Sequence, residues 1–166
     1  MFSLKVIAAC ETEAQCALVR PKGVLATIDF GKKESITRRC LKQTQNSGVK
    51  FVIDTVGGDF FQQAMESIAP GGQIFSLGYS SGKIPIVTMK NLMQFQCSVG
   101  GVWLGGFARR FPKKFHEIIE KVIGMLDEQY FEPTIGAHFK FQQVNEALAH
   151  AREKKMIGKV IMTMRH

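Results

Sequence analysis

Short apolar runs alternate with longer amphipathic stretches along the chain. Four of the runs are nearly continuous, which is typical of strands covered on both faces of a parallel sheet. They lie at residues 5–10, 24–30, 49–56 and 73–78. The stretches between them have helical spacing, and Pro21 and the Pro70-Gly71-Gly72 run are strong stop signals for two of them. We therefore predict helices at residues 11–20, 35–45 and 60–68.

The second half of the chain continues this alternation. A short helix is predicted at residues 87–95, followed by a glycine-rich strand at 97–106 and a long amphipathic helix at 112–130. The remaining elements are a strand, a helix and a strand at residues 135–141, 141–155 and 158–164. This pattern predicts an α/β fold, a Rossmann-like parallel sheet with right-handed crossovers and helices on both faces. Its predicted core holds Val6, Ile7, Val52, Ile53, Ile74 and Phe75.

One element of such a sheet has no counterpart in the pattern. A doubly wound sheet has the strand order 3-2-1-4-5-6, and a glycine-rich phosphate loop follows its first strand. The run at residues 5–10 corresponds to the second strand, so we expect a sheet that lacks its first strand and that loop. We expect the strands at 5–10 and 49–56 to close up as neighbours. The alternatives are that another strand fills the position or that the first third is unfolded.

Composition and charge narrow the class of protein. The chain has 166 residues, 45% of them hydrophobic, which suits a single domain with its own core. The net charge of +8 is explained by basic helix faces, with RNA or phosphate binding as the alternative. No apolar run reaches the length of a membrane span, and the start of the chain lacks the pattern of a signal peptide. We therefore expect a soluble intracellular protein, cytoplasmic or mitochondrial, without a membrane partner.

The cysteines and histidines do not form a metal-binding pattern. Cys10, Cys16, Cys40 and Cys97 contain no C-x-x-C pair, and no histidine stands near them at ligand spacing. We predict free thiols and no metal site. No nucleophile–base order or carboxylate pair stands out either, so no catalytic residue is predicted. Hydride transfer is compatible with this, because the cofactor supplies the chemistry and the protein orients it.

Four segments resemble a known enzyme family. They are KVIAACETEAQCALVRPKGV, VKFVIDTVGGD, APGGQIFSLGYSSG and MIGKVIMTM. Together they resemble the quinone oxidoreductase (ζ-crystallin) branch of the zinc-free medium-chain dehydrogenases/reductases, with a likeness that runs from Phe2 to Met164. The resemblance implies a truncated dinucleotide-binding domain at residues 1–138. It also implies that residues 139–166 form a helix and strand that return to a catalytic domain.

The resemblance implies an NAD(P)H-dependent enzyme that transfers hydride to a quinone or enone. It leaves open whether this chain is active, and we expect weak cofactor binding and no activity from these residues alone. The alternative is a non-catalytic family member that serves as an RNA-binding or subunit-interaction module. Relatives pair across a two-fold axis, which implies a homodimer through residues 97–107.

The resemblance also implies a set of cofactor-binding residues at the ends of the strands. The adenosine end comprises Cys10, Glu11, Thr12 and Phe30, and the nicotinamide end comprises Thr55, Val56, Leu77, Gly78, Tyr79, Val102 and Trp103. Lys159 is assigned near the phosphates by analogy alone. The alternatives are structural: a helix cap at Thr12, a core position for Phe30, a tight turn after Thr55 and a packing role for Trp103.

The resemblance implies NADPH as the cofactor but leaves NADH as an alternative. NADPH is the cofactor that the family implies, because relatives hold its 2′-phosphate with a small hydroxylated residue and a nearby lysine. In this chain that lysine position is Gln15, and Glu11 adds a negative charge beside it. These two departures leave NADH as an alternative.

Overall fold

The computed structural model describes residues 4–153 and 157–164. It divides the chain into two compact units, Met1–Leu104 and Gly105–His166, and each is described by itself. The predicted boundary between residues 138 and 139 concerned a return to a catalytic domain, and it stays a prediction. Within the described residues no helix is both long enough and apolar enough to cross a membrane.

The first unit begins with a small parallel sheet. Strand β1 (Ile7–Cys10) pairs with β2 (Ala26–Asp29), and helix α1 (Glu13–Val19) connects them. A short 3-10 helix, η1 (Arg20–Lys22), follows α1, and Cys16 on α1 is fully buried. The predicted strand–helix–strand unit is confirmed, with each element shorter than its apolar run.

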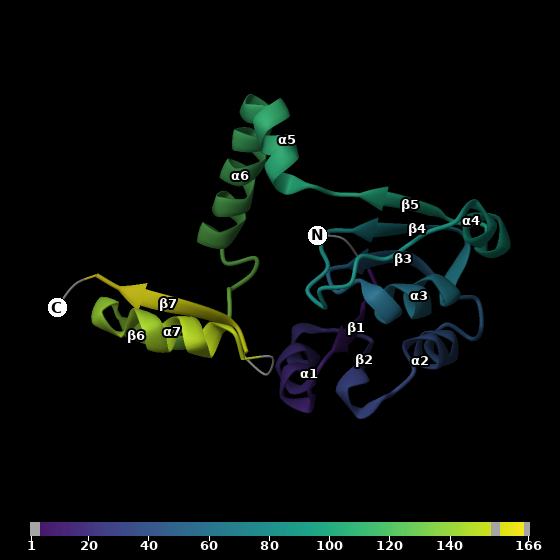
Figure 1. The fold of residues 1–166 in the computed structure, drawn as a ribbon, viewed down its shortest axis with the longest axis horizontal. Helices are drawn as coiled ribbons and strands as arrows, with labels where there is room; N and C mark the ends of the chain where they lie inside the picture. The colour runs from purple at the N-terminus through teal and green to yellow at the C-terminus, as the bar shows by residue number, and fades with distance from the viewer. Residues whose placement is uncertain (1–3, 154–156, 165–166) are drawn as a thin grey trace. The chain divides into compact units, whose positions relative to one another are not determined.

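A second sheet completes the first unit. It has the order β3-β4-β5, all parallel, with β3 at Val49–Asp54, β4 at Ile68–Ser76 and β5 at Ser98–Gly101. Helices α3 (Gly58–Glu66) and α4 (Met89–Phe95) form its crossovers (Figure 1). The core beneath this sheet consists of Phe61, Met65, Ile68 and Ile74.

Helix α2 (Ile36–Gln43) joins the two sheets. Its buried residues Ile36 and Cys40 form a cluster with Ile28 of β2, against which Ile7 of β1 and Val49 of β3 both pack. The backbone N–H of Ile36 also donates to Oε1 of Gln63 on α3 at 2.9 Å, and the Thr37 hydroxyl donates to the Gln63 carbonyl at 3.0 Å. The cluster that α2 forms with Ile28 therefore has side chains of both β1 and β3 packed against it.

The expectation that the two halves close up is wrong. Among the described residues, β1 pairs only with β2, and β3 pairs only with β4. Two of the predicted core residues face this gap or the uncovered side of the sheet, since Val6 is 47% and Ile53 is 71% exposed. Ile74 is fully buried as predicted, whereas Ile7, Val52 and Phe75 are only partly buried. No strand of the described residues pairs with the free edge of β1 or with the free edge of β3.

Two element boundaries also differ from the prediction. Strand β4 begins at Ile68 and runs through Pro70-Gly71-Gly72, where the pairing with β3 shifts register. The proline is tolerated because it stands at the irregular start of the strand. Residues 97–106 are not one strand, because β5 ends at Gly101 and helix α5 (Leu104–Arg110) begins soon after.

The second unit holds the elements that follow. Helix α6 (Pro112–Asp127) precedes strand β6 (Ile135–Lys140), which pairs in parallel with β7 (Lys159–Thr163). Helix α7 (Val144–Ala151) forms the crossover between these strands and buries Ala147 (Figure 1). All of these elements were predicted, within a few residues of their observed ends.

Candidate functional site at the carboxyl ends of the strands

The carboxyl ends of the two sheets lie at one side of the first unit. Phe30 follows the last residue of β2, and Phe60 stands in the first turn of α3, just after β3. Their ring centroids are 4.4 Å apart in a tilted arrangement. Since ligands of open α/β sheets bind outside the carboxyl ends of the strands, this side is the candidate site.

The turn after β3 is held by a buried carboxylate. Asp54 is 6% exposed, and its Oδ1 accepts from the backbone N–H groups of Val56 and Gly57, both at 3.1 Å. Gly57 has φ of +72° and ψ of −161°, a region that L side chains rarely adopt. A Cβ there would also lie 2.7 Å from the carbonyl oxygen of Lys83. A tight turn at this end was predicted from the sequence as the structural alternative, but the Asp54 carboxylate was not predicted as its acceptor, although an Asp three residues before a glycine is a turn signal.

The loop after β4 folds back onto the turn after β3. The backbone N–H of Leu77 donates to the Asp54 carbonyl at 2.7 Å, and Ser80 donates in the same way to Thr55 at 3.0 Å. The Ser81 hydroxyl and its backbone N–H both donate to the carbonyl of Val56. Hydrogen bonds at fixed positions therefore bring together two predicted segments, residues 55–56 and 77–79.

The end of β5 adjoins this pair of loops. The backbone N–H of Val102 donates to the Ser76 carbonyl at 2.9 Å, which places Val102 and Trp103 beside the end of β4. The side chains of Leu77, Tyr79 and Trp103 are 46%, 50% and 71% exposed. Several large apolar side chains therefore stand at the exposed ends of neighbouring parallel strands. Apolar groups gathered in this way mark a binding surface more often than scattered ones do.

The residues at the end of β1 form a helix cap. Thr12 is the N-cap of α1, where its hydroxyl accepts from the Gln15 backbone N–H at 3.2 Å. Oε1 of Gln15 accepts in return from the backbone N–H groups of Glu11 at 2.9 Å and Thr12 at 3.3 Å. The structural role expected of Thr12 is thus present. The sequence analysis treated Gln15 only as a missing lysine, although Thr followed three residues later by Gln is a capping-box signature.

The backbone at this end is also fixed by a close approach. A Cβ added to Gly31, which follows β2, would lie 2.0 Å from the backbone oxygen of Glu11. The loops after β1 and β2 are therefore in direct main-chain contact, and only glycine fits at position 31.

The charged groups near the end of β1 are paired with one another. Arg20 lies 2.6 Å from Glu13, and Lys32 lies 3.3 Å from Asp29 and 3.5 Å from Glu13. Through its hydrogen bond, Arg20 holds the pKa of the exposed Glu13 carboxyl below its usual range. The hydrogen bond to Asp29 likewise raises the pKa of the Lys32 ammonium. Both cations are therefore held by carboxylates of the chain itself.

Cys10 is a poor nucleophile in this position. Burial, followed by the neighbouring Cys16 thiol, raises the pKa of the Cys10 thiol to about 11. The thiol is therefore protonated at neutral pH, whereas a reactive cysteine requires the thiolate. The residue can contribute shape and packing to the site, but the geometry gives it no role in covalent chemistry.

Phe30 and Lys159 complete the set of predicted residues. Phe30 is half-buried and packs on Phe60 and on the cluster around Ile28, which gives it the structural role that was its alternative. Lys159 begins β7 in the second unit, where its backbone N–H donates to the Thr134 carbonyl at 2.8 Å. Its assignment to the phosphates stays a prediction.

A model of the zinc-binding dehydrogenase family matches residues 1–123. The chain belongs to the zinc-binding dehydrogenase family. The resemblance to quinone oxidoreductases among the medium-chain dehydrogenases/reductases is likewise confirmed by similar curated proteins. Quinone oxidoreductase-like protein 2 homolog of Nematostella vectensis is 32% identical over 98% of this chain, and quinone oxidoreductase-like protein 2 of Bos taurus is 29% identical over 99%. The aligned segments cover 44% and 47% of those proteins, so the chain spans about half the length of the curated relatives it matches.

Solved structures of similar fold support the architecture. A quinone oxidoreductase of Pseudomonas syringae superposes with a TM-score of 0.81 over 95% of this chain and 48% of that protein, at 24% identity. A mycobacterial protein solved in complex with NADPH superposes with a TM-score of 0.83 over 95% of this chain and 49% of that protein, at 20% identity. These similarities confirm the predicted Rossmann-like α/β fold.

The name of the family implies a zinc ion in some of its members. Across residues 4–153 and 157–164 no group of three or more His, Cys, Asp or Glu side chains is placed to hold a metal ion. The residues described here therefore do not fit a zinc ion, and no step of the chemistry is assigned to one.

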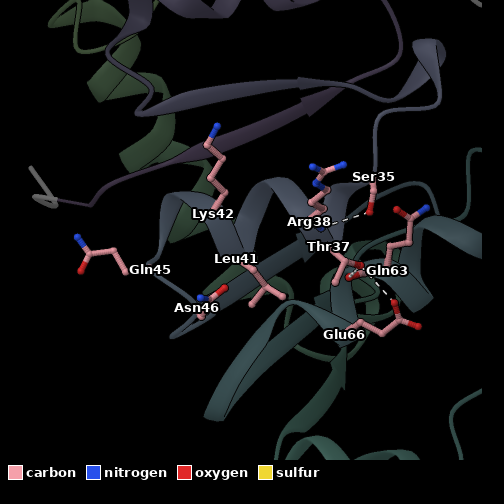
Figure 2. A pocket seen from close by; sticks show the side chains of 9 residues that line it. All are labelled: Ser35, Thr37, Arg38, Leu41, Lys42, Gln45, Asn46, Gln63 and Glu66. Carbon is pink, nitrogen blue, oxygen red and sulfur yellow. Dashed lines mark hydrogen bonds between the residues drawn. The ribbon is translucent and has the colours of Figure 1, made fainter.

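One surface hollow of the first unit is lined by none of the predicted residues. It has a volume of about 820 Å³ and lies between α2 and α3. Figure 2 shows its lining, in which the Thr37 hydroxyl donates to Glu66 at 3.2 Å and Ser35 caps α2 through Arg38. Thr37 bonds across the hollow to Glu66 and to the Gln63 carbonyl, and we assign the hollow no ligand.

Proposed function

We propose that this chain forms the nucleotide-binding part of an NAD(P)H-dependent oxidoreductase that transfers hydride to a quinone or enone. The observation that carries the proposal is the gathering of residues 55–56, 77–79 and 102–103 at the carboxyl ends of three adjacent parallel strands. The names of similar proteins support the substrate class, and the fold of an NADPH-bound neighbour supports the cofactor class.

The two ends of the site would bind different parts of the cofactor. Residues 10–12 at the end of β1 would face the adenosine ribose, and the exposed Leu77, Tyr79 and Trp103 would provide an apolar surface for the nicotinamide. The cofactor, when bound, supplies the hydride. The residues of this chain bind and orient it, and no protein nucleophile is required.

Binding by these residues alone should be weak. Pyrophosphate affinity in such folds comes largely from unoccupied backbone N–H groups at a helix N-terminus. In this chain Thr12 caps α1, Ser35 caps α2, and the Gly58 N–H at the start of α3 donates to the Lys83 carbonyl at 3.0 Å. We expect dissociation constants above the low micromolar range, toward the upper end of the roughly 1 μM–1 mM span usual for enzyme substrates.

The test is a titration of the ¹⁵N-labelled chain with NADH and with NADPH, followed by NMR. We expect saturable amide shifts at residues 55–56 and 77–79. Tyr79→Ala should weaken binding several-fold because it removes apolar contact area. Met93→Ala is the control, since Met93 is also an exposed apolar residue of the first unit, at 74%, but lies on α4, which leads into the amino end of β5. Shifts confined to other surfaces, or none up to millimolar cofactor, would overturn the proposal.

Pairing of two copies through residues 97–107 belongs to the same proposal. Strand β5 is at the edge of its sheet, and Ser98, Gly100 and Gly101 are exposed along it. A free edge of this kind can accept another strand. The apolar Trp103 and Leu104 follow directly, with 71% and 59% of their surface exposed.

A further inference from the structure

We propose that the adenosine end of this site selects NAD(H) over NADP(H), with Glu11 as the residue that sets the preference. The inference rests on the proposed function, because it assumes that a dinucleotide binds at the carboxyl ends of the strands. It rests further on three observations at the end of β1, which concern hydrogen-bond donors, cations and one unpaired carboxylate.

The backbone N–H donors of Glu11 and Thr12 are already engaged in hydrogen bonds. A 2′-phosphate brings acceptor oxygens and a charge close to −2, and it needs donors that can turn toward it. The backbone N–H groups of Glu11 and Thr12 donate to Oε1 of Gln15, and the Thr12 hydroxyl accepts from the Gln15 backbone. Binding a phosphate through the two amides would require the capping box of α1 to break, and the Thr12 O–H is a donor of the box that the cap does not use.

Three basic side chains near this end are held in ion pairs. Arg20 is held by Glu13 at 2.6 Å and donates from Nε to the Thr27 hydroxyl at 3.3 Å. Lys32 is held by Asp29 and Glu13, and Arg39 lies 2.8 Å from Glu34. Lys33 instead lines a second hollow together with residues of α2. Arg20, Lys32 and Arg39 are thus each paired with a carboxylate, and within the part of the chain that the structure describes Lys33 is the cation of the loop after β2 that is not.

Glu11, in contrast to Glu13 and Asp29, forms no ion pair with a cation among the described residues. Its side chain is half-buried. Its backbone is held by Gln15 on one side and by the close approach of Gly31 on the other. A carboxylate at the end of this strand can accept hydrogen bonds from ribose hydroxyls. The same carboxylate repels a 2′-phosphate, and the charges of Arg20 and Lys32 are already offset by Glu13 and Asp29.

The experiment compares matched ligands on the full chain by calorimetry and by NMR. The probes are NADH and NADPH, together with adenosine 5′-monophosphate and adenosine 2′,5′-bisphosphate, which isolate the adenosine end. We expect the ligands without a 2′-phosphate to bind roughly tenfold or more tightly than their partners, the scale of one charge repulsion near a protein surface. The amides of Glu11 and Thr12 should shift in those titrations.

Variants separate the role of Glu11 from general charge effects. Glu11→Gln should bring the affinities for each pair of ligands to within a few-fold of one another by strengthening binding of the 2′-phosphates. Glu66→Gln on α3 removes the same charge elsewhere in the first unit and should leave the ratio unchanged. The amide spectra of both variants check that the fold is retained.

Each remaining result decides either against this inference alone or against both proposals. Equal or tighter binding of the 2′-phosphorylated ligands by the wild-type chain overturns the preference for NAD(H), and so does an unchanged ratio in Glu11→Gln. Shifts at residues 55–56 and 77–79 without shifts at Glu11 would retain the proposed function and reject this inference. The absence of shifts with all four probes would reject both.

Discussion

Gly31 shows how one missing side chain can fix the geometry of a site. The oxygen it approaches is the backbone carbonyl of Glu11, so the neighbour cannot rotate out of the way as a flexible side chain would. Gly31→Ala should destabilise the chain by about 1–3 kcal/mol, the usual cost of an added carbon in a filled space. Chemical denaturation at constant pH measures this change.

The matched control for Gly31→Ala is Gly101→Ala. Gly101 is also outside the positive-φ region, but a Cβ there would meet nothing within 4 Å. We expect a change of less than about 0.5 kcal/mol for this exposed position. Equal effects of the two substitutions would contradict a specific contact between the loops after β1 and β2.

At the residue scale, sequence reasoning predicted positions better than roles. It placed Glu11, Thr12 and Phe30 at strand ends, and each lies there. It could not assign the partner of Phe30, because the contact with Phe60 depends on how α3 packs between the two sheets. The roles of Gln15 and Asp54 were locally encoded as a capping box and an Asx turn, and a search for turn chemistry would have found both.

The connection from β3 to α3 is the element on which the nicotinamide end depends. Asp54 holds the Val56 and Gly57 amides, and the loop after β4 bonds to the same turn. Asp54→Ala leaves these amides without their acceptor, at about 1–3 kcal/mol for each buried amide. We expect a clear loss of stability, measured by thermal and urea unfolding.

Asp54→Asn tests whether the acceptor oxygen or the charge matters. An asparagine keeps one carbonyl oxygen, and Oδ1 is the atom that both amides share. The loss should therefore be smaller than in Asp54→Ala, with amide shifts in residues 77–81 retained near their wild-type positions. If both variants lost the same stability, the turn would depend on the negative charge and not on the hydrogen bonds.

Element order was largely predictable, and the exceptions have local causes. Continuous apolar runs and amphipathic spacing are strong signals, so the strands β1 to β5 and the helices between them were all found. Strand β4 started earlier than predicted because Pro70 and two glycines, which usually end an element, are accommodated where the pairing shifts register. Helix α5 was missed because Trp103 and the glycines around it have no helical period.

At the scale of the whole molecule, the main feature is the unfilled position between β1 and β3. The order β2-β1, then β3-β4-β5, matches the doubly wound order without its central strand. Sequence reasoning identified that position correctly but mispredicted its consequence. Ile7 of β1 and Val49 of β3 pack against one cluster formed by Ile28 of β2 and by Ile36 and Cys40 of α2, although the two strands do not pair with each other.

The exposed edge of β3 gives this arrangement a residue-by-residue signature. In a parallel ladder, alternate residues of a strand bond to opposite sides. Leu77 donates to the Asp54 carbonyl, and Asp54 is paired with Ser76, so the amides of Val52 and Asp54 point toward β4. The amides of Phe51 and Ile53 must then point toward the unpaired side, and their side chains are 53% and 71% exposed.

We therefore expect alternating hydrogen exchange along β3 in the 166-residue chain. The Val52 and Asp54 amides should exchange slowly, and those of Phe51 and Ile53 should exchange at least about tenfold faster, because an amide that faces water needs no opening of the sheet to exchange. NMR-detected exchange at neutral pH resolves the four sites. Uniform protection of all four would mean that a strand occupies the position, from a second copy or from another segment. Uniformly fast exchange would mean that β3 is not stably paired with β4.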